Sequence, residues 1–167
     1  ADDALYQAKK TGRNCTVCHG ALRSSITPLR LQWVPEWNSG HPEIDAQHRL
    51  LIEMANEYFN VALNPLAKSA GAVSLLTNLL RELATHFDFE ERILEQIGYP
   101  RVKEHRRIHH EMLRKAATLN ESYQSGEVKL SSFVSFLVDD VVIGHMLQED
   151  QLYYTLTREK FGSQHLI

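Results

Sequence analysis

The stretch LATHFDFEERILEQIGYPRVKEHRRIH, Leu83 to His109, decides both the fold and the chemistry of this chain. A glycine–tyrosine–proline turn divides it, and glycine and proline both end helices. His86 and Glu90 stand four residues apart before the turn, and His105 and His109 stand four apart after it. This spacing places two side chains above one another on one helical face. The stretch therefore predicts two helices, joined tightly, with metal-binding side-chain types on their inner faces.

The same periodicity extends over most of the chain. Apolar residues recur at three- and four-residue intervals in four segments, at about 43–63, 69–97, 101–124 and 131–158. Four helices of about 20 to 28 residues with short connections predict an all-α fold. We expect an antiparallel up-down-up-down four-helix bundle at residues 33–161. The tryptophan-containing stretch that opens it is expected to be an extended arm lying on the bundle.

Composition narrows the class of partner. Apolar residues make up 43% of the chain and charged residues 23%, and the formal net charge is -3. This balance gives no electrostatic case for nucleic acid or an anionic membrane. No apolar run approaches the roughly 18 residues that a membrane-spanning helix needs. The first residues do not read as a secretory leader, so a cytoplasmic location is expected. The sequence leaves open whether the chain forms an oligomer.

All four predicted helices carry ionisable residues on their apolar stripes. Five histidines and two carboxylates in one apolar core would be costly unless they were paired or bound to metal. A lone inward histidine is more often a hydrogen-bonded core residue, but here every stripe has one. The predicted metal-binding set is His48, His86, Glu90, His105, His109, His145 and Asp150.

Counting ligands favours two metals over one. A tetrahedral zinc takes four ligands, which is too few for this set. Two octahedral ions have twelve positions; five histidines, two bridging carboxylates and one bridging oxygen species leave one open. Imidazole with carboxylate suits iron. A ferritin-like site would need Glu-x-x-His motifs, and none occurs in the sequence.

Residues 33 to about 160 resemble a bacterial hemerythrin domain. The matching words are IDAQH (44–48), HFDFEE (86–91), YPRVKEHRRIH (99–109) and HMLQED (145–150). The resemblance implies a di-iron centre, without haem, that binds dioxygen. It implies that His105, His109 and His145 hold one iron, that His48 and His86 hold the other, and that Glu90 and Asp150 bridge them.

The open position is expected to face an apolar pocket that shelters dioxygen from water. Closeness to the metal-binding histidines nominates Leu51, Phe87 and Ile143 as its walls. One spacing does not fit a regular helix, because residues five apart, such as His145 and Asp150, lie about 140° apart. Either Asp150 reaches round, or the helix is locally widened.

The first residues resemble something else. ADDALYQAKKTGRN (1–14) is similar to the closing helix and turn of GGDEF diguanylate cyclase domains, which a short strand follows. We expect residues 1–18 to be such a remnant, 19–32 a linker and 162–167 a tail. Cys15-x-x-Cys18-His19 has the spacing of a c-type haem attachment site. Such attachment follows export, so the cysteines are interpreted as strand residues instead.

The GGDEF signature is absent, so we expect this chain not to be an enzyme. The leading hypothesis is an oxygen or redox sensor that regulates an attached cyclase. An oxygen carrier or store, a di-iron oxidase or peroxidase, and a nitric oxide binder stay open. The charge-rich stretches EERILEQ and EHRRIHHEMLRK are predicted to be mostly solvated helix faces, and His41, His110 and His165 are not expected to be ligands.

Overall fold

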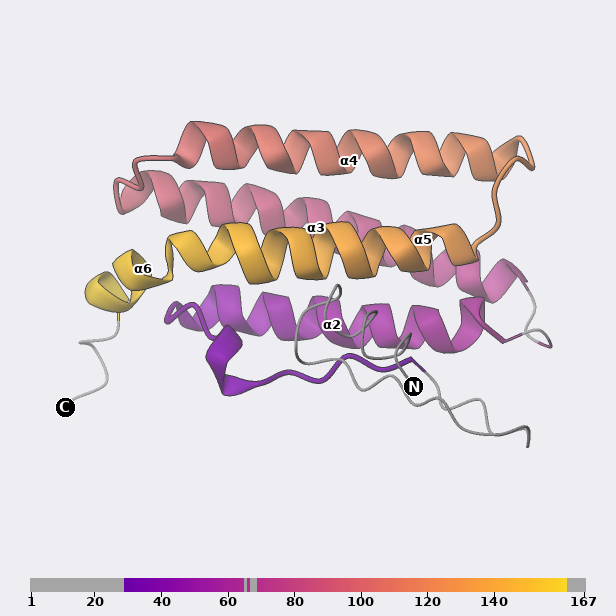
Figure 1. Cartoon of the computed structure of the whole chain (residues 1–167), viewed down its shortest axis with the longest axis horizontal. Helices are drawn as coiled ribbons and strands as arrows, with labels where there is room; N and C mark the ends of the chain where they lie inside the picture. Colours follow the sequence, from indigo (N-terminus) through magenta and orange to yellow (C-terminus); the bar gives the residue numbers. More distant parts are fainter. Residues whose placement is uncertain (1–28, 65, 67–68, 162–167) are drawn as a thin grey trace, which may run out of the picture.

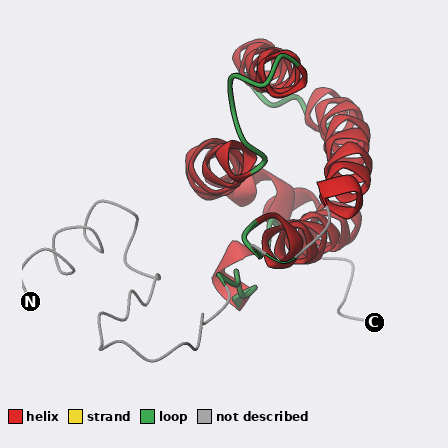
Figure 2. Ribbon diagram, turned by 90° about the vertical axis from the view of Figure 1, so that its right-hand side faces the viewer, coloured by secondary structure: helices red, strands yellow, loops and turns green. Residues whose placement is uncertain are grey.

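The computed structural model describes residues 29–64, 66 and 69–161. Its first three long helices are α2 (Pro42–Ala62), α3 (Ser69–Gln96) and α4 (Val102–Gln124). Each runs antiparallel to the one before it, and a fourth rod returns beside them (Figure 1). Seen along the bundle, the four rods surround one interior (Figure 2). The predicted all-α, up-down-up-down bundle is confirmed. The predicted GGDEF remnant, the cysteine motif and the tail lie outside the described residues.

The fourth rod departs from the single α-helix that the sequence predicts over 131–158. It begins as α5 (Ser131–Ser135) and widens into the π-helix η2 (Phe136–Glu149). It then tightens into the 3-10 turn η3 (Asp150–Leu152) and ends as α6 (Tyr154–Phe161). A π-helix bonds each N–H to the carbonyl five residues earlier, which widens the turn. The prediction was right about the position of this rod, and the local widening that it left open extends over 14 residues.

Three apolar clusters lie in the interior, and two of them flank the predicted metal set. The larger is built around fully buried side chains, among them Tyr58, Phe59, Leu79, Leu83, Phe133 and Leu137. A smaller one contains Leu94, Tyr99, Tyr153 and Tyr154. Burying each large apolar side chain contributes about 1.5–3 kcal/mol. Along α3, Leu83 and Phe87 belong to the first cluster and Leu94 to the second, and Glu90 lies between them. The polar residues of the predicted metal set therefore sit in a layer between two apolar clusters.

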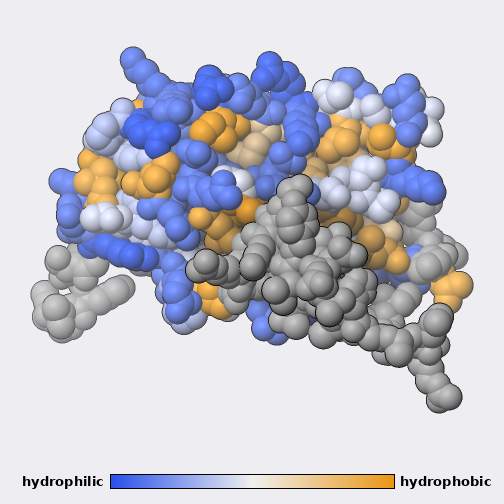
Figure 3. All heavy atoms as spheres, viewed as in Figure 1, coloured by the Kyte–Doolittle hydropathy of each residue, from blue (hydrophilic) through white to orange (hydrophobic). Residues whose placement is uncertain are grey.

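Hydrophilic residues dominate the outer helix faces in the view of Figure 3. His110 is exposed, as expected for a residue about 100° round from His109. Among the described residues, no helix has the length and apolarity needed to cross a bilayer.

The arm, residues 29–41, is bound to the bundle at two places. At its start, the Asn56 side chain accepts a hydrogen bond from the Leu31 N–H (2.7 Å) and donates one to the Leu31 carbonyl (2.9 Å). Beyond it, Trp33 and the 3-10 turn η1 (Pro35–Trp37) pack against a cluster of Ile52, Val142 and Met146. The expectation that the arm's tryptophans lie on the bundle is confirmed.

The second attachment joins the end of the arm to the end of the fourth rod. The Thr157 hydroxyl donates to the Ser39 carbonyl (2.5 Å), and Asp45 accepts from the Ser39 N–H (2.6 Å). Gly40 lies against Arg158 here with φ +90°, a conformation that favours glycine. A Cβ at this position would lie 2.5 Å from the Arg158 Cγ and 3.2 Å from its Cα. The turn therefore requires glycine for both conformation and space.

Replacing Gly40 with alanine should lower the free energy of unfolding by about 1–3 kcal/mol, because the new side chain is strained as well as crowded. Chemical denaturation measures the change. Gly71→Ala is the matched control, since Gly71 is exposed in α3 with open space at its Cβ. It should stabilise the helix by roughly 0.5–1 kcal/mol. Equal stabilities for the two variants would contradict the role given to Gly40.

Candidate metal centre

All seven residues of the predicted set converge in the layer between the two apolar clusters. They come from every rod of the bundle, and each is at most 2% exposed. His48 comes from α2, and His86 and Glu90 from α3. His105 and His109 come from α4, and the fourth rod supplies the last two, His145 and Asp150. No single helix could form this cluster, because the antiparallel packing is what brings the four faces together.

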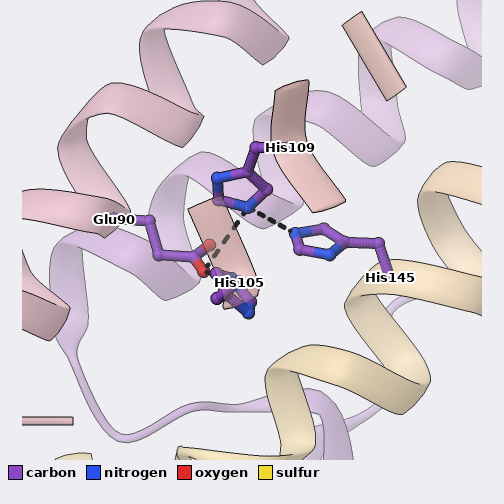
Figure 4. A group of neighbouring side chains, drawn as sticks. All are labelled: Glu90, His105, His109 and His145. Atoms are coloured by element: carbon purple, nitrogen blue, oxygen red, sulfur yellow. Dashed lines mark hydrogen bonds and ion pairs between the residues drawn. The ribbon is translucent and has the colours of Figure 1, made fainter. Parts of the chain in front are cut away.

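Three histidines and one carboxylate oxygen form the first group (Figure 4). The Nε2 atoms of His109 and His145 are 2.8 Å apart, and the Glu90 Oε1 lies 2.5 Å from the His105 Nε2. All four ligand atoms lie within 4.8 Å of one another. Two nitrogens about 2.1 Å from one ion, at a right angle, would be separated by about 3 Å. The first group therefore has the dimensions of a metal-binding site.

His48 and His86 form the second group with the other oxygen of the same carboxylate. Their Nε2 atoms are 3.0 Å apart, and the His86 Nε2 lies 3.0 Å from the Glu90 Oε2. Glu90 thus turns one oxygen toward each group. This is the arrangement of a carboxylate that bridges two metals.

Asp150 is placed in the same way. Its Oδ1 lies 3.1 Å from the His145 Nε2, in the first group, and its Oδ2 lies 3.4 Å from the His48 Nε2, in the second. The π-helix makes this possible, since the Asp150 N–H donates to the His145 carbonyl five residues earlier. Of the two solutions left open by the sequence, the structure shows the widened helix.

Two residues that sequence reasoning left without a role support the histidines from behind. The His109 Nδ1 lies 2.8 Å from the Glu91 Oε1, and the His86 Nδ1 lies 3.0 Å from the Gln47 Oε1. Both oxygens accept, so each Nδ1 carries the proton and each Nε2 presents a lone pair to the site. Both residues stand inside the quoted motif words, but nothing in their spacing distinguished them from surface residues. The prediction of a solvated face is wrong for Glu91, which is buried.

Burial and charge set the protonation of the cluster. Burial lowers the pKa of His48, takes that of His109 to about 4, and holds that of His145 well below its ordinary value. Burial alone would raise the pKa of Glu90, but hydrogen bonds from the surrounding imidazoles, His105 first, hold it well below the usual range. Near neutral pH the imidazoles of His48, His109 and His145 are therefore unprotonated and Glu90 is ionised.

Burial, with the neighbouring Glu90 charge, raises the pKa of Asp150 well above its ordinary value. Neither oxygen of Asp150 has a hydrogen-bond partner among the described residues, and neither does the Glu90 Oε2. Buried carboxylate oxygens without partners are costly. Two metal ions between the groups would satisfy all three oxygens, so the residues fit the ions that the ligand count predicts.

The three predicted pocket residues are placed differently. Leu51 lines a small apolar cavity of about 10 Å³, together with Val142 and Met146 among others. Phe87 lies in the core, stacked on the His109 ring with centroids 3.8 Å apart. Ile143 is half-buried and does not line this cavity. Two residues before His145, it lies on roughly the opposite face of either kind of helix. A ligand-facing role for Phe87 and Ile143 stays a prediction.

Residues 39–157 match the model of the hemerythrin HHE cation-binding domain. A bacteriohemerythrin from Stenotrophomonas maltophilia is 30% identical over 123 residues, which cover 74% of this chain and 78% of that protein. One from Pseudomonas aeruginosa is 26% identical over 132 residues, 79% and 84% of the two chains.

The fold agrees with these matches. The crystal structure of a wild-type hemerythrin superposes with a TM-score of 0.67 at 21% identity, covering 76% of this chain and 97% of that one. The family match lies within the segment predicted to form the bundle, and contains all seven residues of the metal set. This chain belongs to the hemerythrin family of HHE cation-binding domains.

Proposed function

We propose that this domain binds two iron ions and, through them, reversibly binds dioxygen. The observation that carries the proposal is the division of the cluster into a three-histidine and a two-histidine group, with Glu90 and Asp150 facing both. His105, His109 and His145 would hold one ion, and His48 and His86 the other. When bound, the pair supplies the reversible electron exchange with dioxygen that protein side chains lack.

The donor set is compatible with iron. Five imidazoles and two bridging carboxylates suit ions of octahedral preference. The two-histidine group offers one protein ligand fewer than the other, so the open position belongs there. The apolar cavity adjoins both groups in the sequence, because Leu51 stands three residues after His48 on α2 and Met146 directly follows His145 on η2. The cavity lining of leucine, valine and methionine would exclude water and protons from the ligand.

The direct test is the iron content of the purified chain, together with its visible spectrum as oxygen is added and removed. Two iron ions per chain and a reversible spectral change are expected. A single zinc per chain, or no metal, would end the proposal. Steady turnover of peroxide or of a reductant would favour a di-iron oxidase or peroxidase instead, and tighter binding of nitric oxide than of oxygen would name a different ligand.

Leu51→Ala should speed autoxidation of the oxygenated form, because it opens the apolar wall beside His48 to water. Leu50→Ala is the matched control, since Leu50 is 46% exposed on the same helix and should leave the rate unchanged. The decay of the oxygenated spectrum measures both. Ile143→Ala in the same assay tests whether Ile143 faces the bound ligand, and an unchanged rate would remove Ile143 from the pocket. A rate for Leu51→Ala equal to that of Leu50→Ala would show that the cavity does not shelter the ligand.

We further propose that the domain is an oxygen sensor that controls an attached diguanylate cyclase. Residues 1–14, with their GGDEF-like wording, support the identity of the neighbour. The arm supports the route, because residues 29–41 stand between that segment and α2 in the sequence and pack on the bundle. Its Trp33 ring lies 6.3 Å from the His48 ring, and Trp33 also packs beside residues that line the cavity. For this to be regulation, the affinity of the domain for oxygen must differ between two conformations of the arm.

The sensor is tested by cyclase output of the parent protein with and without oxygen. Different rates are expected, and equal rates would reject sensing while leaving oxygen carriage or storage in place. Asn56→Ala, which removes both hydrogen bonds to Leu31, should reduce the difference. Asn60→Ala, at an exposed asparagine one turn further along α2, should not.

A further inference from the structure

The two histidines that are supported from behind belong to different metal positions and have different partners. His109, in the three-histidine group, is backed by the carboxylate of Glu91 at 2.8 Å. His86, in the two-histidine group, is backed by the amide of Gln47 at 3.0 Å. Among the described residues, the Nδ1 atoms of His48 and His145 have no partner. One metal position therefore has an anionic support behind a ligand, and the other has a neutral one.

Glu91 is itself held in place. Its Oε2 accepts from the Arg106 Nε at 2.8 Å, and the Arg106 Nη2 donates to the Glu95 Oε1 at 2.7 Å. Side-chain exposure rises along this series of three charged side chains, from 12% for Glu91 to 35% for Arg106 and 54% for Glu95. A row of charged groups thus leads from a buried ligand to the surface. Because α3 supplies Glu91 and α4 supplies Arg106, the packing of these two helices fixes its geometry.

The charge of the support affects the metal. A carboxylate behind an imidazole fixes its orientation and tautomer and makes the ring a stronger electron donor. A stronger donor favours the more oxidised metal. A neutral amide fixes the tautomer with little of this electronic effect. Arg106 shares the Glu91 carboxylate and draws its charge away from His109, so it should moderate the effect.

We propose that Glu91 is a positioning residue that favours the ferric state at the three-histidine position, with Arg106 limiting the effect and Gln47 leaving the other position without it. The inequality of the two metals is thereby built into the groups behind their ligands. This inference rests on the proposed iron pair.

The test is the midpoint potential of the iron-loaded chain, followed by its visible spectrum. Glu91→Gln keeps the shape and removes the charge, and should raise the potential. A tenfold change in the preference for the ferric state corresponds to about 59 mV for one electron. Arg106→Gln should shift the potential in the opposite direction. Arg107→Gln is the matched control, because Arg107 is 59% exposed and pairs only with Glu111 among the described residues. Unchanged potentials, or shifts of the same sign in the Glu91 and Arg106 variants, would overturn the proposal.

A second measurement separates this inference from the iron proposal. In zinc-loaded chain with labelled histidines, the Nδ1–H proton of His109 should resonate far downfield in the wild type and move upfield in Glu91→Gln. Retention of zinc by this variant should weaken about 10–100-fold. A wild type that takes up no iron would defeat the proposed function, and the zinc experiment would still decide the role of Glu91. An unchanged chemical shift of the His109 Nδ1–H proton in Glu91→Gln would contradict the role proposed for Glu91.

Discussion

Replacing Glu90 with glutamine should empty both metal positions at once. Glu90 is fully buried, and its two oxygens face different histidine groups, 2.5 Å from His105 on one side and 3.0 Å from His86 on the other. A glutamine of the same size has one amide nitrogen, which donates and carries no lone pair for a metal. Removing a group that hydrogen-bonds a metal ligand typically lowers metal affinity about 10–100-fold. Removing a ligand that both metals share should therefore lower it at least about 100-fold.

Metal content per chain after purification, and metal affinity by titration, measure this loss. Glu82→Gln, two turns earlier on α3 with an exposed side chain, is the control and should keep its metal. Thermal unfolding of the metal-free proteins shows whether the Glu90 variant still folds. It should, because a buried charge has been replaced by a neutral amide. Retention of one ion by Glu90→Gln, with only the other lost, would show that Glu90 does not bridge.

The site could be predicted from the sequence to the extent that it follows helical spacing. His86 with Glu90 and His105 with His109 are each four apart, so a regular helix brings each pair together and the bundle brings the pairs to one layer. Asp150 shows the limit. Its five-residue distance from His145 was recognisable as an anomaly, but the π-helix that resolves it depends on packing around the whole fourth rod.

The supporting groups were beyond sequence reasoning for a different reason. Gln47 and Glu91 reach histidines 39 and 18 residues away, so their roles depend on how neighbouring helices are rotated against each other. Glu91 also belongs to the charge-rich run EERILEQ, which is typical of a solvated helix face. Likewise, the pocket residues were predicted from their closeness in sequence to the metal-binding histidines. That criterion nominated Ile143, whereas Val142 and Met146, four residues apart on η2, line the cavity.

Acid should destabilise the metal-free protein well before its carboxylates titrate. Burial lowers the pKa of His48, His109 and His145 in the folded state, whereas in the unfolded chain each has its ordinary value near 6.5. Below pH 6.5 the unfolded chain therefore binds more protons than the folded chain, and the free energy of unfolding decreases as the pH is lowered. For His109, whose folded pKa is about 4, the loss between pH 6.5 and 4 is about 3 kcal/mol. Asp150 acts against this loss of stability, because its raised pKa makes the folded state bind a proton at a higher pH than the unfolded state.

Three buried histidines outnumber one carboxyl, so the net effect is a loss of stability, and bound metal should suppress it by competing with protons for the same nitrogens. Urea unfolding of the metal-free and metal-loaded chain at pH 7, 5.5 and 4.5 measures both. His109→Gln should reduce the slope of stability against pH by up to about 1.4 kcal/mol per pH unit, the contribution of one proton. His110→Gln, the exposed neighbour, should leave it unchanged. Stability of the metal-free protein that stays level or rises from pH 7 to 4.5 would mean that these imidazoles are not held unprotonated by burial, and that the cluster is not poised to accept metal.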